Sequence, residues 1–229
     1  MLWNKKYKYP KSSRNLIDGI RYYSVNGEKL PSVTEILELT KPQKEKDALK
    51  KWQLKVGKVE SQRISNESTT RGSKLHKYLE NFFLNRINGD LLEKDDLAEK
   101  MANEIIENGI KGKLTEIYGS EATLFFPGKF SGTCDAVGYY EGAECILDFK
   151  NSRSPKRKEW IHSYLLQLGG YAKAHNKIFN SNITKGVILM CSTDLTFQKF
   201  IVEGMEFKKL QDDFLKRVDL FYEMISKKQ

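Results

Sequence analysis

Cysteine is scarce in this sequence. Its 229 residues include three cysteines, Cys134, Cys145 and Cys191, which lie far apart and form no CxxC pair. An odd, dispersed set argues against a disulfide framework. Three thiols are also too few for a four-cysteine iron–sulfur cluster, so we expect no such cluster in this chain. The sequence therefore predicts buried thiols in a reducing, intracellular compartment.

Long hydrophobic segments are absent as well. No run approaches the roughly 18 apolar residues that indicate a transmembrane helix. The basic start, MLWNKKYKYPKSSR, is not followed by the apolar segment of a secretory signal. Internal repeats and long low-complexity segments are also missing. We expect a cytoplasmic protein with no membrane partner.

Positive charge is in excess. Lysine and arginine number 39 against 30 aspartate and glutamate residues, which gives a formal net charge of +9. Such a balance favours a polyanionic partner, either nucleic acid or an acidic membrane face. A soluble protein with surplus lysine accounts for the same composition, so charge alone leaves both interpretations open.

The hydrophobic pattern predicts one α+β domain over residues 19–229, preceded by a loose, polar and basic arm at residues 1–18. A hairpin around Asn26-Gly27 is expected first, because Asn-Gly is a strong turn signal. A helical part follows over about 34–110, with helices at about 43–56, from near Thr70, and at about 95–108. Leu49, Trp52 and Val56 are the expected anchors of the helix at 43–56.

The pattern of the remaining residues, about 120–229, predicts the core of the domain. Three strands form a meander, a long helix follows at 159–179, and two strands and a C-terminal helix complete the chain. This order indicates a mixed central sheet flanked by helices, in the α/β (α+β) class.

The segment GTCDAVGYYEGAECILDFK, residues 132–150, carries charges where a buried hairpin is expected. If Glu141-Gly142 is a two-residue turn, Asp135 faces Asp148 across the two strands. Opposed residues have Cβ atoms about 4.5–5.5 Å apart. Lys150 points to the same face as Asp148 because side chains alternate along a strand. Cys134 is expected on the other face.

Two opposed carboxylates destabilise a sheet unless something offsets their repulsion. A divalent cation does so, because hard cations prefer carboxylate oxygens. Two alternatives remain open at this point. Lys150 could neutralise two structural aspartates, or a bulge could shift the register so that the pair never meets.

Other candidate groups accompany the hairpin. His76 and Glu80 share one helix face, as do Gln167 and Tyr171. An imidazole can add a nitrogen ligand to a carboxylate site, although a single helical histidine is more often a surface or core residue. Four basic residues could contact phosphates, although basic loops are usually solvated surface. These are Arg71, Lys156, Arg157 and Lys158.

This pattern of His76, Asp135, Asp148-Phe149-Lys150 and Gln167-x3-Tyr171 resembles the PD-(D/E)XK nuclease superfamily. It is most similar to the RecB-type branch, and the whole-chain pattern to the compact exonucleases typified by the mitochondrial genome-maintenance exonuclease and phage-encoded proteins. The motifs LPSVTEIL, RGSKLH, SEATLFF, SGTCDAVG, ILDFKNS and LLQLGGYA occur in the expected order over about residues 20–200. One departure is Asp148, where glutamate is commoner.

The resemblance implies a restriction-endonuclease-like core and a role for each matching residue. Asp135, Asp148 and Lys150 would be catalytic, and Mg²⁺ or Mn²⁺ would be the cofactor. Its ligands would be His76, Asp135, Asp148 and the Phe149 carbonyl. The supporting or DNA-contacting residues would be Glu80, Glu121, Gln167, Tyr171, Arg71, Lys156 and Arg157. Glu80 matches a ligand position of some branches, but His76 holds that place here.

The implied function is metal-dependent hydrolysis of DNA, as an exonuclease on DNA with single-stranded ends. Such an enzyme would act in replication, recombination or repair, as a monomer with replication or recombination proteins as partners, and a phage-encoded form would act in the host cytoplasm. Two alternatives are a non-catalytic nucleic-acid-binding protein on the same fold and an endonuclease.

Overall fold

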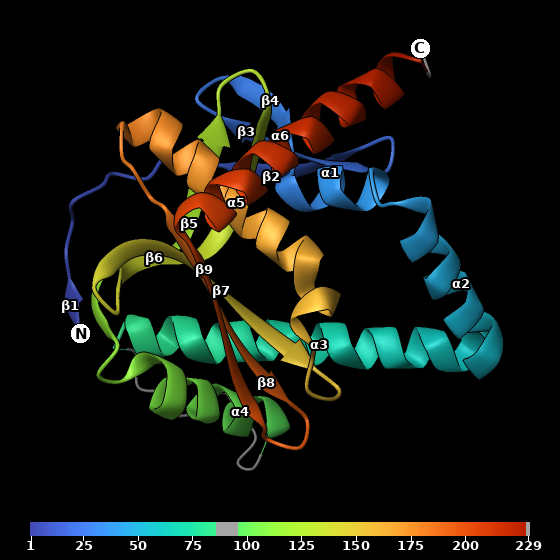
Figure 1. The fold of residues 1–229 in the computed structure, drawn as a ribbon, viewed down its shortest axis with the longest axis horizontal. Helices are drawn as coiled ribbons and strands as arrows, with labels where there is room; N and C mark the ends of the chain where they lie inside the picture. The colour runs from blue at the N-terminus through green and yellow to red at the C-terminus, as the bar shows by residue number, and fades with distance from the viewer. Residues whose placement is uncertain (86–95, 228–229) are drawn as a thin grey trace.

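A six-stranded mixed sheet forms the centre of the computed structural model, which describes residues 1–85 and 96–227 (Figure 1). The strand order is β1-β5-β6-β7-β8-β9. Pairs β1/β5 and β7/β8 are parallel and the other pairs are antiparallel, which confirms the predicted mixed sheet. The strands are β1 (Leu2–Trp3), β5 (Leu114–Phe126), β6 (Phe130–Tyr140), β7 (Ala143–Ser152), β8 (Lys185–Ser192) and β9 (Phe197–Glu203).

Helices cover both faces of this sheet (Figure 1). Helices α5 (His162–Phe179) and α6 (Gly204–Ser226) pack on one face, and α3 (Lys58–Phe83) and α4 (Leu97–Ile105) on the other. Both faces of the central strands are therefore buried, as expected for near-continuous apolar runs. Along β7, Ile146 packs in the α5/α6 layer and Leu147 in the α3/α4 layer.

Helix α5 carries Gly169 and Gly170, whose lack of side chains permits close contact with α6. A Cβ at Gly169 would lie 2.9 Å from the backbone of Leu210, and one at Gly170 would lie 2.8 Å from the ring of Phe214. The glycine pair therefore serves helix–helix packing.

A small second sheet precedes the helical part. Its strands are β2 (Ser13–Ile17), β3 (Ile20–Val25) and β4 (Glu28–Pro31), in that order. Asn26 and Gly27 have φ values of 46° and 80°, which fit the predicted Asn-Gly hairpin. Strand β2 was not predicted from the sequence.

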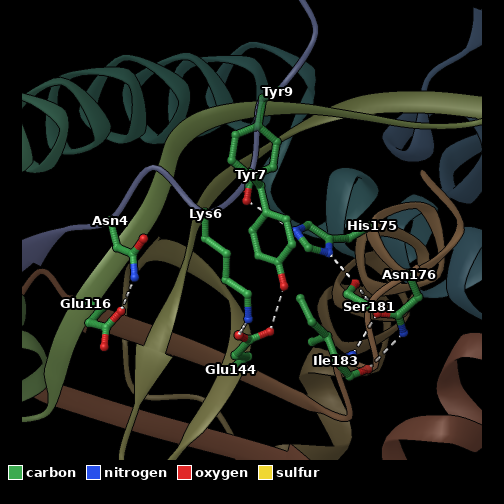
Figure 2. A network of polar contacts seen from close by, with 10 residues as sticks. All are labelled: Asn4, Lys6, Tyr7, Tyr9, Glu116, Glu144, His175, Asn176, Ser181 and Ile183. Carbon is green, nitrogen blue, oxygen red and sulfur yellow. Dashed lines mark hydrogen bonds and ion pairs between the residues drawn. The ribbon is translucent and has the colours of Figure 1, made fainter. Parts of the chain in front are cut away.

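The prediction of a loose arm at residues 1–18 is wrong. Leu2 and Trp3 pair with β5, and β2 joins the small sheet. Figure 2 shows Lys6 and Tyr7 reaching Glu144 on β7. The rings of Tyr7 and Tyr9 pack against other aromatic rings of the core, so the segment buries apolar surface despite its lysines. Its contacts on α5 are with His175 and Phe179.

The helical part begins with α1 (Val33–Leu39), whose first turn is capped by the Ser32 hydroxyl. Helix α2 (Gln43–Val56) has the predicted bounds; of its predicted apolar anchors, Trp52 and Val56 are half-buried and Leu49 is exposed. Leu49 is 43% exposed. Helix α2 packs mainly on α3 and stands off the sheet (Figure 1), which leaves no core for these anchors.

Helix α3 starts at Lys58, earlier than the predicted start near Thr70, because only Gly57, at φ 87°, separates it from α2. For the helix predicted at 95–108, residue 95 lies outside the described residues. Helix α4 continues into a π-helical turn, Ile106–Ile110.

No helix in the described parts of the chain has both the length and the apolar character needed to span a bilayer. All three cysteines are free and buried, as predicted.

Candidate active site

The β6–β7 hairpin forms with the predicted turn and register. Glu141 and Gly142 occupy the turn with φ values of 41° and 88°. Cross-strand pairs run from Tyr140↔Ala143 to Ala136↔Leu147. The pairs end one residue before Asp135 and Asp148, where the strands stop sharing backbone hydrogen bonds.

Asp135 replaces the missing backbone contact with its own side chain. Its Oδ2 atom accepts a hydrogen bond of 2.6 Å from the Phe149 backbone N–H. Cys134 pairs with Ala122 of β5 and packs in the α5/α6 layer, whereas Ala136 packs in the α3/α4 layer. The prediction that Cys134 and Ala136 share a face is therefore wrong, because the alternation along β6 is interrupted at Asp135, opposite Glu121 with its positive φ.

Asp148 is a buried carboxylate whose oxygens accept no hydrogen bond from the described residues. It is 1% exposed, and its Oδ2 atom lies 2.5 Å from the Lys150 ammonium. That contact is an ion pair by distance, but neither carboxylate oxygen has a partner in hydrogen-bond geometry among the described residues. Burial and the charge of Asp135 raise the Asp148 pKa to about 6, although Lys150 opposes this shift. A cation would offset the cost of this site.

Lys150 provides a positive charge beside both acids. Burial alone would lower its pKa, but the charges of Asp148 and Asp135 raise it above the usual value. Its Nζ atom also lies 5.2 Å from the centre of the Tyr164 ring. Lys150 is therefore an ammonium at neutral pH, held between a carboxylate and an aromatic face.

His76 reaches the same place from α3. Its Nε2 atom lies 2.9 Å from the Phe149 carbonyl oxygen, and its Nδ1 atom lies 3.4 Å from Asp135 Oδ1. Burial would lower the pKa of His76, but the Asp135 charge and hydrogen bond raise it to about 9. The imidazole therefore lies between two oxygen acceptors.

Glu121 lies closer to these residues than the predicted supporting role suggested. The pairs Ser120↔Ala136 and Ala122↔Cys134 flank it, which places Glu121 opposite Asp135. Its backbone has φ 49°, an uncommon value for a residue with a side chain. Burial and the Asp135 charge raise its pKa to about 7. One ligand atom from each of Glu121, His76 and Asp135 lies within 4.8 Å of the others.

The candidate ligands that the structure brings together are His76, Glu121 and Asp135, while Asp148 lies beside Lys150 on the next strand. Together with the Phe149 carbonyl beside His76, carboxylates of this kind suit Mg²⁺ or Mn²⁺.

Gln167 and Tyr171 contact each other on α5. Gln167 Nε2 donates a 3.2 Å hydrogen bond to the Tyr171 hydroxyl. The Tyr171 ring is buried, 2.9 Å from where a Cβ on Gly132 would lie. Gln167 lines a cavity of about 290 Å³ between α1 and α5. Tyr171 therefore packs in the core behind the site, while Gln167 borders open space.

The predicted basic residues separate into two groups. Arg71 donates a 3.0 Å hydrogen bond from Nε to Asn151, and Arg71 and Lys156 line one cavity. Arg157 instead lies over the ring of Trp160, at 5.5 Å.

Glu80 forms a 3.0 Å ion pair with Lys77 on the same helix, and its charge is among those that raise the pKa of Glu121. Tyr164, which lies beside Lys150, was not predicted from the sequence. The one sequence feature that pointed to it is an aromatic residue on the helix after the hairpin.

Comparison with known proteins gives distant but consistent matches. The chain is 25% identical over 189 residues to mitochondrial genome maintenance exonuclease 1 of Xenopus tropicalis, covering 76% of this chain and 51% of the relative. It is 28% identical over 181 residues to the protein of the same name from Mus musculus, covering 72% and 50%. The chain thus spans about half the length of these curated relatives.

The comparisons with solved structures and with family models are less informative than those with the curated relatives. A crystal structure from Eubacterium rectale, of a protein provisionally named an exonuclease, matches with a TM-score of 0.46 and 14% identity, over 66% of this chain and 64% of that one. No model of a known protein family matches the chain.

The mixed sheet presents Asp135, Asp148 and Lys150 together, and the two relatives share sequence over about three quarters of the chain. The RecB-type branch stays a prediction from the sequence. By these matches, the chain is similar to the mitochondrial genome maintenance exonucleases.

Proposed function

We propose that this chain is a metal-dependent nuclease that hydrolyses phosphodiester bonds of DNA, acting as an exonuclease on DNA with single-stranded ends. The observation that carries the proposal is Asp148, a buried carboxylate without hydrogen-bond partners among the described residues, beside Asp135 and Lys150. The names of the relatives support exonuclease action in genome maintenance. The net charge of +9 supports a polyanionic substrate.

Five groups would hold Mg²⁺ or Mn²⁺ in this proposal. They are the side chains of His76, Glu121, Asp135 and Asp148 and the Phe149 carbonyl. A bound divalent cation supplies positive charge for the phosphate and lowers the pKa of water. The hydrogen bond from Phe149 N–H to Asp135 fixes both the carboxylate and the peptide that carries the carbonyl.

Lys150 has a separate part in the reaction. Negative charge grows on the phosphate oxygens as a phosphodiester is attacked, and a fixed ammonium nearby stabilises that charge. The Lys150 ammonium is held by Asp148 and the Tyr164 ring. It needs no reorganisation when the substrate reacts, because its position is set before binding.

The test is degradation of an end-labelled single-stranded oligonucleotide in Mg²⁺ or Mn²⁺. Wild-type protein should shorten the strand progressively, and Lys150→Ala should lose at least about 100-fold in rate, as expected for a main electrostatic group. Full activity in folded Lys150→Ala would overturn the assignment. Tight binding without cleavage would favour the non-catalytic alternative, and cutting of closed circular DNA would favour an endonuclease.

We also infer an intracellular site of action, supported by the three buried, unpaired thiols. The expected monomer can be tested by light scattering of the purified chain.

A further inference from the structure

A second polar cavity adjoins the candidate active site. It has a volume of about 400 Å³ and lies between α3, the end of β7 and the start of α5. We call it the basic pocket and define it by six lining residues. These are Arg63, Arg71, Asn151, Arg153, Lys156 and Tyr164.

Positive charge in the basic pocket is mostly uncompensated. Four of its lining residues are cations and one, Glu67, is a carboxylate. Arg63 is paired with Glu60 and Glu67 on its own helix, and the charge of Arg153 also acts on Glu60. Among the described residues, no carboxylate lies within ion-pair distance of the other three, Arg71, Arg153 and Lys156. Cations lining one cavity repel each other, so an anion bound among them would be stabilised.

The backbone of the pocket is held in place by side chains from neighbouring strands. Gln198 on β9 accepts from the Lys156 N–H at 2.7 Å and donates to the Lys156 carbonyl at 2.9 Å. The Thr193 hydroxyl donates to the Arg153 carbonyl at 2.8 Å. Asn151 accepts from Arg71 Nε at 3.0 Å, which orients that guanidinium. These contacts fix the loop that carries Arg153 and Lys156. Preorganisation of this kind lowers the free-energy cost of binding a ligand.

The pocket shares a wall with the reaction site. Asn151 directly follows Lys150 in β7. Tyr164 lines the pocket, and its ring lies 5.2 Å from the Lys150 ammonium. Tyr164 therefore borders both the basic pocket and the Lys150 ammonium.

We propose that the basic pocket binds the phosphate next to the scissile phosphate on the same strand and so positions the bond to be cut. The inference rests on the proposed function and adds a second anchoring point for the substrate. Arginine and lysine around a fixed loop suit phosphate oxygens. The phosphate could belong to an internal phosphodiester or to a strand terminus.

Binding can be measured without cleavage, in EDTA, with a fluorescent single-stranded oligonucleotide. For single strands, the slope of log K against log salt falls by about 0.7 for each phosphate contact removed. Arg153→Gln and Lys156→Gln should each show such a loss, together with weaker binding. Lys208→Gln is the matched control, because Lys208 is an exposed lysine bordering a cavity at the opposite end of β8. It should bind like wild type.

A single uncharged methylphosphonate linkage locates the contact. Placed next to the scissile position, it should weaken binding of wild-type protein but have a smaller effect on Arg153→Gln, because that variant has already lost the contact. In cleavage assays, Arg153→Gln should raise KM more than it lowers kcat, and Arg153→Lys should restore part of the loss. Thermal melting verifies that each variant is folded.

Oligonucleotides with a 5′-hydroxyl, a 5′-phosphate or a 3′-phosphate distinguish a terminal phosphate from an internal phosphodiester as the group bound in the pocket. A wild-type preference for one terminal phosphate that disappears in Arg153→Gln assigns the pocket to a strand end. Equal binding of all three assigns it to an internal phosphodiester.

The proposal is overturned if folded Arg153→Gln and Lys156→Gln both bind with the affinity and salt slope of Lys208→Gln. If these variants weaken binding while wild-type protein cleaves nothing in Mg²⁺ or Mn²⁺, the pocket stands and the nuclease proposal fails.

Discussion

The carboxylate of Asp135 accepts a hydrogen bond from the backbone N–H of Phe149 at 2.6 Å, at the point where β6 and β7 stop pairing. This contact lets the strands separate without leaving the Phe149 N–H unsatisfied. It also orients the Phe149 peptide, whose carbonyl oxygen lies 2.9 Å from His76. One side chain thus ends the cross-strand pairing and organises the site.

Asp135→Asn and Asp135→Ala should separate these two roles. Asparagine keeps an oxygen acceptor for the Phe149 N–H but loses the charge that raises the pKa of His76, so it should be the more stable of the two variants. Alanine leaves that N–H without its acceptor, which costs about 1–3 kcal/mol. Both variants should lose nuclease activity, because neither has a carboxylate at this position. Urea denaturation and strand degradation measure the two effects. Nuclease activity at the wild-type level in Asp135→Asn would contradict the metal role of Asp135.

Asp148 should give the metal-free protein an unusual pH dependence. Its folded pKa, about 6, is above its unfolded value, so the native state binds more protons between about pH 4 and 6. This group's contribution to stability is present below about pH 4 and is lost as the pH rises through about 6. In EDTA, Asp148→Asn should therefore gain up to about 3 kcal/mol relative to wild type between pH 4 and 7. Urea denaturation at both pH values measures the difference, and a pH-independent difference would be inconsistent with a raised pKa.

His175, which the N-terminal segment contacts (Figure 2), should make stability change with pH in the opposite direction. It is fully buried between the Tyr9 hydroxyl, 3.2 Å from Nε2, and Ser181, 2.7 Å from Nδ1. Burial lowers its pKa to about 4, although Glu144 acts to raise it. The unfolded state therefore binds more protons between about pH 4 and 6.5, and stability falls as the pH drops through that window.

His175→Gln should remove up to about 3 kcal/mol of that acid sensitivity. Denaturation midpoints at pH 7 and 4.5 measure it. Equal loss of stability on acidification in wild type and His175→Gln would show that another group is responsible.

Gly169→Ala should destabilise the α5–α6 interface. Alanine gains about 1 kcal/mol of helix propensity over glycine. Its Cβ would however lie 2.9 Å from the Leu210 backbone, which cannot rotate away. Overpacking of this kind costs about 1–3 kcal/mol, so a net loss of stability is expected. A thermal midpoint at or above that of wild type would show that α6 can shift without cost.

Local sequence signals predicted the hairpin well. The Glu141-Gly142 turn and the apolar alternation of β6 and β7 fixed the register, because a one-residue slip would move every side chain to the wrong face. The end of that register at Asp135 was not predictable, because it depends on a carboxylate bonding to the backbone of the neighbouring strand.

Long-range packing explains the remaining differences. Residues 1–18 are polar and basic in composition, and only the folded protein provides the α5 rings against which Tyr7 and Tyr9 pack. Leu49 and its neighbours have helical spacing, but α2 has no face against the sheet. Glu121 looked like a supporting residue until its register placed it opposite Asp135.

Calorimetric titration of Mn²⁺ into the protein, with an uncleavable oligonucleotide present, tests the central claim most directly. The account predicts saturable binding to wild type that is lost in both Asp135→Asn and Asp148→Asn but kept in Lys208→Gln. Equal Mn²⁺ binding by wild type and the two aspartate variants would contradict it.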